Sequence, residues 1–70
     1  FATRQQLQGQ GLGTQLLKEV LSKLQQEGVQ SVFLDARLTA VPFYLRAGFT
    51  TEGNPFIRKG LTFIRMVKQF

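Results

Sequence analysis

The chain contains no cysteine and no histidine among its 70 residues. A disulfide framework and a Cys/His zinc site are therefore excluded, although small domains commonly depend on one or the other. The absence of cysteine fits a cytoplasmic protein. No apolar run approaches the length of a membrane span and no signal-peptide pattern is visible. We therefore expect a cytoplasmic location and no membrane partner.

Acidic residues are also scarce, because four Asp and Glu accompany nine Lys and Arg, for a formal net charge of +5. That balance suits an anionic partner, such as a nucleic acid or a polyphosphate cofactor. The basic residues are spread along the chain without a dense block, which makes nucleic acid the less expected partner. A chain of this length allows one small domain, which buries only about 60% of the surface that its unfolded form exposes.

Glycine is concentrated in one segment, residues 8–16, where Gly9, Gly11 and Gly13 directly precede an amphipathic helix. A glycine-rich turn that opens a helix aims several backbone N–H groups at one point, where the helix dipole favours negative charge. This pattern predicts a phosphate or pyrophosphate site. The competing interpretation is an ordinary turn, but glycine at three alternate positions weakens a helix start unless it serves a purpose.

Apolar periodicity and glycine stops predict the order partial strand, helix, strand, helix, strand, strand. The expected elements are the end of a strand at residues 1–3, a helix over 11–27, a strand over 29–36, a helix over 40–47, and strands over 49–52 and 61–70. The first helix has an apolar face of Leu12, Leu16, Leu17, Val20, Leu21 and Leu24. Gly28 and Gly48 end the two helices, and Thr39 caps the second. Residues 53–55 and 58–60 read as turns. Apolar side chains on both faces of residues 61–70 place that strand inside the sheet.

The first helix should connect two parallel strands, which places the glycine loop at the carboxyl end of the first strand, where α/β sheets bind ligands. One interpretation is a dinucleotide site, with Gly9 and Gly11 before the helix and Asp35 after the next strand. Against it, Thr14 stands where a third glycine is needed, and residues 4–8 are too polar for a buried first strand. The P-loop lysine pattern is also absent.

The other interpretation is acyl-coenzyme A binding. Gln8-x-x-Gly11-x-Gly13 and residues 40–49, with Phe43-Tyr44 ahead of a Gly-Phe pair, resemble two signatures of the GNAT superfamily of N-acetyltransferases. Residues 60–68 resemble the last strand of several bacterial members, which often carry His where this chain has Phe63. The resemblance covers nearly the whole chain but only the C-terminal half of that fold, a β-α-β-α-β-β mixed α/β sheet. We therefore expect a single partial domain over residues 1–70, either a fragment or a small protein completed by a second chain, such as a homodimer.

The resemblance also implies roles for individual residues. Acetyl-coenzyme A is the implied co-substrate, with its pyrophosphate held by backbone N–H groups of Leu7, Gln8, Gly9, Gln10, Gly11, Leu12, Gly13 and Thr14. Tyr44 is implied to protonate the leaving thiolate. The alternative is that Tyr44 is a half-buried aromatic residue of the helix with a packing role only. Phe43 is core or a wall beside the pantetheine arm. Arg46 and Lys18 are solvated side chains within reach of a coenzyme phosphate.

The carboxylates Asp35 and Glu52 are conceivable bases, although a surface position is the stronger expectation for both. The resulting hypothesis is the acetyl-CoA-binding portion of an N-acetyltransferase that acts on an amine of unknown identity. A backbone N–H from the strand before the loop would stabilise the oxyanion. The alternative is a non-enzymatic basic α/β module that binds nucleic acid or a protein.

Overall fold

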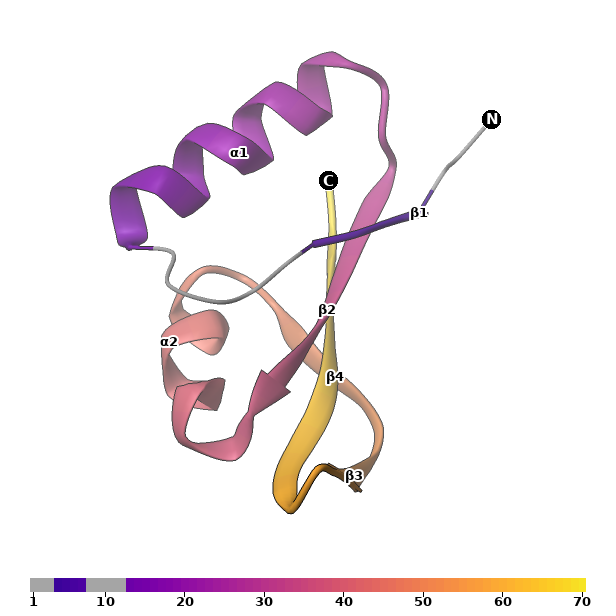
Figure 1. Ribbon diagram of the computed structural model, residues 1–70. Helices are drawn as coiled ribbons and strands as arrows, with labels where there is room; N and C mark the ends of the chain where they lie inside the picture. Colours follow the sequence, from indigo (N-terminus) through magenta and orange to yellow (C-terminus); the bar gives the residue numbers. More distant parts are fainter. Residues whose placement is uncertain (1–3, 8–12) are drawn as a thin grey trace.

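The computed structural model describes residues 4–7 and 13–70, which form a four-stranded sheet with two helices (Figure 1). The elements are β1 (Arg4–Gln6), α1 (Thr14–Gln26), β2 (Ser31–Arg37), the 3₁₀ turn η1 (Leu38–Ala40), α2 (Val41–Arg46), β3 (Thr50–Arg58) and β4 (Leu61–Gln69).

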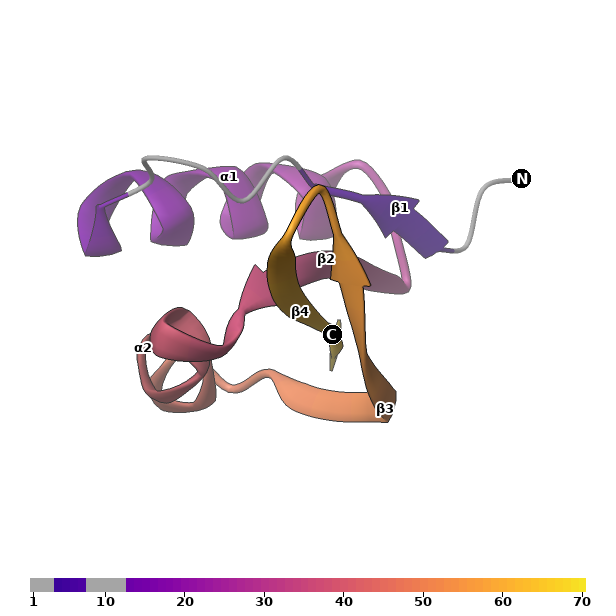
Figure 2. The same ribbon diagram turned by 60° about the horizontal axis from the view of Figure 1, so that its bottom comes forward.

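The strands follow the order β1-β2-β4-β3, which can be traced in Figure 2. β1 runs parallel to β2, and α1 connects them; β4 is antiparallel to both β2 and β3. The position of β4 between β2 and β3 confirms the prediction that this strand lies inside the sheet. The mixed α/β architecture is likewise as predicted.

Helix α1 packs through Leu17, Leu21 and Leu24, whose three- and four-residue spacing places them on one face. It ends where expected, because Gly28 takes a φ of +89° that other residues rarely adopt. Its first residue is Thr14, later than the predicted residue 11, since Gly13 still has an extended backbone. Leu16 was wrongly placed on the buried face: it lies at the margin of the apolar stripe and is 48% exposed.

Helix α2 is short, and Pro42 lies in its first turn, where the missing backbone N–H of proline costs little. The expected cap at Thr39 is wrong, because Thr39 lies inside η1 and the N-cap residue is Ala40, which makes no side-chain capping bond. The 3₁₀ turn leads directly into the helix and leaves no extended residue to act as a cap. Gly48, with a φ of +95°, ends the helix as predicted.

Strand β3 is longer than the expected residues 49–52. It continues through the segment 53–55 that reads as a turn, and its pairing with β4 shifts register between Glu52 and Phe56. The segment therefore forms a bulge within an edge strand, a position that tolerates proline. The hairpin turn narrows to Lys59 and Gly60, both with positive φ, as two-residue turns between antiparallel strands require.

The sheet separates an apolar face from a charged one. On the first, Val32, Leu34, Ala36, Ile64 and Met66 pack with residues of both helices to form the core. Strand alternation sends the intervening residues of β2 and β4 to the opposite face. No helix of residues 4–7 and 13–70 is long and apolar enough to span a bilayer.

Candidate functional site

The described part of β1 pairs with β2 over three residues. Their register runs from Arg4 opposite Ser31 to Gln6 opposite Phe33, and the Leu7 N–H then donates to the Phe33 carbonyl at 2.8 Å. β2 continues to Arg37, and over its last residues no described part of β1 pairs with it. Alternate residues of a strand direct their N–H and C=O to the same side. The backbone of Asp35 therefore faces the β1 side of β2, beyond the last residue of β1 that the structure describes.

The first turn of α1 lies at the end of the helix nearer to α2 (Figure 1). Gly13 is its N-cap, no side-chain capping bond is made by Gly13, and the first turn contains no acidic residue. The first N–H groups of any α-helix lack partners within the helix. A Cβ built at Gly13 would have no heavy atom of the described chain within 4 Å, and its φ of −78° and ψ of 168° suit any residue. The described fold therefore does not require glycine at this position.

The residues predicted to hold the pyrophosphate divide into three groups. Gln8, Gly9, Gln10, Gly11 and Leu12 lie outside the described residues. Gly13 and Thr14 lie exposed at the start of α1.

Leu7 differs from the rest of this segment. Its side chain is 8% exposed and joins the core, and its N–H is already bonded to Phe33. The prediction that the Leu7 N–H holds the pyrophosphate is therefore wrong, since that donor is used within the sheet.

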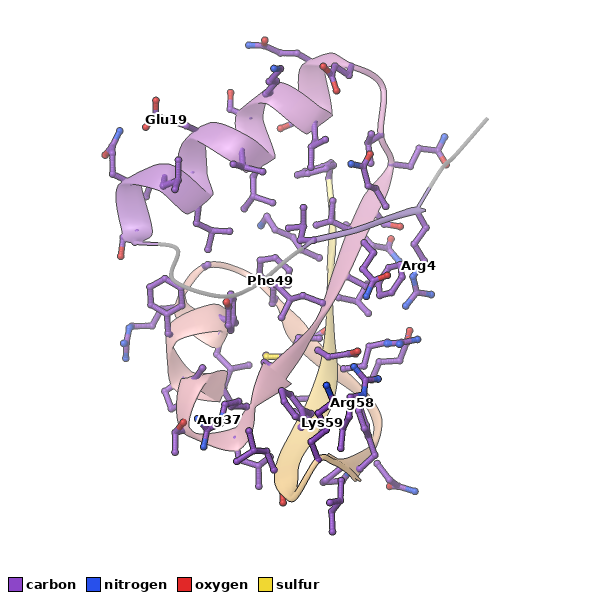
Figure 3. The ribbon with its side chains drawn as sticks, in the orientation of Figure 1. Arg4, Glu19, Arg37, Phe49, Arg58 and Lys59 are labelled. Carbon is purple, nitrogen blue, oxygen red and sulfur yellow. The ribbon has the colours of Figure 1, made fainter. Side chains whose placement is uncertain are left out.

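Tyr44 lies on α2, on the same side of the sheet as α1, and is only 4% exposed. Its ring meets Phe43 and Phe49 edge to face, with ring centroids 5.0 and 5.5 Å apart. Figure 3 places Phe49 between the helices and the sheet. Burial raises the pKa of the Tyr44 phenol above its usual value of 10.0 because the phenolate would lose hydration. At neutral pH the group therefore carries its proton.

The side chains near Tyr44 take different positions. Phe43 is half-buried and packs against the core. Arg46 is exposed in the last turn of α2, and Lys18 is exposed on α1. The two cations thus occupy the solvated positions that the sequence predicts for them.

Asp35 and Glu52 are both held in ion pairs. The expectation of a surface position is wrong for Asp35, whose side chain is 9% exposed. Its carboxylate accepts a hydrogen bond from Arg65 Nε at 3.1 Å and lies 3.5 Å from Arg58 Nη2. Glu52 accepts from Arg4 Nη2 at 2.6 Å while remaining half exposed.

This charged cluster is the feature that sequence reasoning missed. Its members come from all four strands, and Asp35 meets Arg65 only because the two residues are register partners of β2 and β4. The sole sequence signal was the alternation of charged and apolar residues in β4. Within residues 4–7 and 13–70, no group of His, Cys, Asp and Glu side chains could hold a metal ion.

Comparison with known proteins connects this arrangement to acetyltransferases. The model of the acetyltransferase (GNAT) domain matches residues 1–70. A candidate N-acetyltransferase from Lactobacillus plantarum is similar at 31% identity and a TM-score of 0.78, over 89% of this chain. An acyl-CoA N-acyltransferase from Pseudomonas aeruginosa is similar at 27% identity and a TM-score of 0.74, over 87% of this chain.

A third structure extends the likeness of fold. A GCN5-related N-acetyltransferase from Rhodopseudomonas palustris has a TM-score of 0.71 at 22% identity over 91% of this chain. The chain spans 42% of the length of each of these three solved chains.

Proposed function

Because the chain belongs to the GNAT acetyltransferase family, we propose that it binds acetyl-coenzyme A and contributes to acetyl transfer onto an amine. The observation that carries the proposal is the uncapped start of α1, the helix that connects the parallel strands β1 and β2. This helix N-terminus and the edge of β2 would then serve one elongated ligand, with the diphosphate at the first and the amide-bearing arm at the second.

The N-terminus of α1 supports the assignment of the pyrophosphate. The macrodipole places roughly half a positive charge there, and no acidic residue of the first turn opposes an anion. Gly13 leaves open space in which a phosphate can approach the backbone of Thr14. Arg46 and Lys18 are exposed and positively charged. We assign them to the phosphates as long-range electrostatic partners.

The edge of β2 beyond the described part of β1 supports the assignment of the pantetheine arm. That arm contains amide groups, and amides bind at a strand edge as an added strand does. The backbone N–H and C=O of Asp35 face the β1 side of β2, beyond the last described residue of β1. Phe43, half-buried at the side of the core, is proposed as an apolar wall for the arm.

Tyr44 is proposed as the proton donor to the departing thiolate. Acetyl-coenzyme A supplies an activated acyl group, and an attacking amine displaces a thiolate from it. Thiols ionise near pKa 8.5, whereas burial raises the pKa of Tyr44 above 10.0. The phenol therefore carries its proton when the thiolate departs and can donate a hydrogen bond to the sulfur, whereas full proton transfer to this weaker base is uphill. Its burial keeps it away from bulk water.

Calorimetric titration with acetyl-coenzyme A tests the proposal. Pantetheine, which lacks the diphosphate, is the matched ligand, and we expect it to bind at least tenfold more weakly because charge-assisted bonds each contribute about 1.5–3 kcal/mol. A folded chain that binds neither ligand, or binds both equally, would contradict the assignment. In a turnover assay, replacing Tyr44 with Phe removes the proton and retains the ring, so unchanged turnover would exclude its role as donor.

A further inference from the structure

The sheet face opposite the core bears an open hollow of about 400 Å³. Its lining comes from β3 and β4 and comprises Glu52, Gly53, Asn54, Phe56, Arg58 and Arg65. The β-bulge creates this hollow, because the shift of register between Glu52 and Phe56 carries β3 away from even pairing. Figure 3 shows Arg4 and Arg58 on the side of the sheet away from both helices.

The hollow has an excess of positive charge. Arg58 and Arg65 share one carboxylate, that of Asp35, and Glu52 is paired with Arg4. One guanidinium charge therefore remains uncompensated at the hollow. Asp35 is 9% exposed, whereas the side chains of Arg58 and Arg65 are 57% and 41% exposed. Solvent thus reaches both of these cations but little of Asp35. Glu52, whose side chain is 48% exposed, also lines the hollow, with its charge paired to Arg4. The excess charge that an entering ligand meets is therefore that of one guanidinium.

Aromatic rings hold these cations in place. The Arg58 guanidinium lies 5.3 Å from the ring centroid of Phe56 and 5.9 Å from that of Phe63. The Arg65 guanidinium lies 4.8 Å from the centroid of Phe33. Such contacts reduce the conformational freedom lost when a ligand binds. Guanidinium groups in fixed orientation are suited to a planar carboxylate, which they bind through two parallel hydrogen bonds.

Asp35 links this hollow to the edge of β2 that is assigned above to the pantetheine arm. Its carboxylate contacts the two arginines, and its backbone faces the β1 side of β2. From β4 or β3 to that side of β2 is one and a half to two and a half strand spacings, about 7–12 Å. A ligand that joins the two places must therefore be longer than an α-amino acid, in which amine and carboxylate share a carbon.

We propose that the hollow binds the carboxylate of the acetyl acceptor, and that the acceptor is a carboxylate-bearing amine with several bonds between its two charged groups. This inference rests on the proposed function for the identity of the reacting end. The carboxylate site itself depends only on Arg58, Arg65 and the hollow.

Binding of 6-aminohexanoate, measured by titration in the absence of acetyl-coenzyme A, tests the site. Hexylamine is the matched ligand without a carboxylate, and glycine is the short ligand with both groups. We expect 6-aminohexanoate to bind at least tenfold more tightly than hexylamine, since it alone engages the guanidinium pair. Equal binding of these two compounds would overturn the proposal without any variant.

The variant Arg58→Gln removes the more exposed cation and retains the bond from Arg65 to Asp35. Lys23→Gln is the control, because it removes one positive charge from the exposed surface of α1, on the other side of the sheet. We expect Arg58→Gln to lower the affinity for 6-aminohexanoate at least tenfold. Lys23→Gln should leave the affinity for this ligand unchanged. Equal effects of both variants would show attraction by net charge alone and would refute the site.

Acetylation of the same compounds separates this inference from the proposed function. Acetylation of 6-aminohexanoate in preference to glycine supports the acceptor assignment, and the reverse preference overturns it. Failure of acetyl-coenzyme A to bind, together with Arg58-dependent binding of 6-aminohexanoate, would refute the proposed function and support a carboxylate site independent of it.

Discussion

Replacing Gly13 with Ser should raise the stability of the protein and weaken its affinity for acetyl-coenzyme A. A Cβ at this position meets no described atom, and the backbone angles are allowed for any residue. Serine at an N-cap is better than glycine by a few tenths of a kcal/mol. Loss of glycine also lowers the entropy of the unfolded chain, which contributes about 0.4–1 kcal/mol. The free energy of unfolding should therefore rise by about 0.6–1.4 kcal/mol.

For a domain of this size, that gain corresponds to a rise in Tm of about 2–11 °C. Calorimetry of the unliganded protein measures it, and titration with acetyl-coenzyme A measures the affinity. We expect the affinity to fall at least tenfold, because the new side chain enters the space through which the diphosphate approaches the N–H groups of α1.

The matched control is Gly28→Ala at the other end of α1. Gly28 has a φ of +89° with no atom near a built Cβ, so alanine there should cost about 1–2 kcal/mol through backbone strain alone. Its affinity for acetyl-coenzyme A should be unchanged below the Tm. A fall in Tm for Gly13→Ser would mean that the fold needs this glycine, and unchanged affinity would refute its role at the diphosphate.

Three further predictions concern the core and its margin. Phe49→Ala should lower the free energy of unfolding by about 3–5 kcal/mol, most of the stability of a small domain, because Phe49 is 1% exposed. Ile57→Ala is the control and should cost little, because Ile57 is 75% exposed. Equal losses of stability in chemical denaturation would refute the assigned core. Gly48→Ala should lower the Tm, because φ is +95° and a Cβ would displace the Lys68 ammonium; an unchanged Tm would show that the turn relaxes. Tyr44 is the only tyrosine, so its ionisation can be followed by phenolate absorbance. Burial raises the pKa of Tyr44 in the folded protein, so the phenol of the unfolded chain ionises at lower pH. The free energy of unfolding should therefore decline as pH rises above about 10. The variant Tyr44→Phe lacks the phenol and should lack this contribution to the decline.

Much of the fold was predictable because local chemistry and tertiary structure agree. Gly28 and Gly48 end helices through positive φ, a preference that belongs to glycine itself. The leucines of α1 repeat at helical spacing, and β4 is apolar on both faces, which placed it between two neighbours. In these cases the signal lies within a few residues of the feature it predicts.

The errors arose where a distant partner decides the outcome. The segment with Gly53 and Pro55 has the composition of a turn, yet pairing with β4 continues the strand through it as a bulge. Thr39 has the chemistry of a cap, but η1 occupies the place where an extended residue would be needed. Local composition predicts what a segment can form alone, and these segments are shaped by their neighbours.

The candidate site was predictable in part for the same reason. The start of α1 and the aromatic pair around Tyr44 follow from motifs, whereas the pairing of Asp35 with Arg58 and Arg65 depends on the register of three strands. A one-residue change of register would send Asp35 toward the core. The hollow shared by these charged residues could therefore not be predicted from the sequence, because they are far apart in it.

The sheet order also has a consequence for biosynthesis. β2 is flanked by β1 on one side and β4 on the other, and Ser31 pairs with Gln69, about 40 positions later in the chain. At roughly 5–20 residues per second, a ribosome needs about 2–8 s to make that intervening segment. During this interval residues 32–34 have been made but the strand that pairs with them has not. The sheet can therefore close around β2 only after Gln69 has been added, so the pairing of β2 with β4 forms late in synthesis.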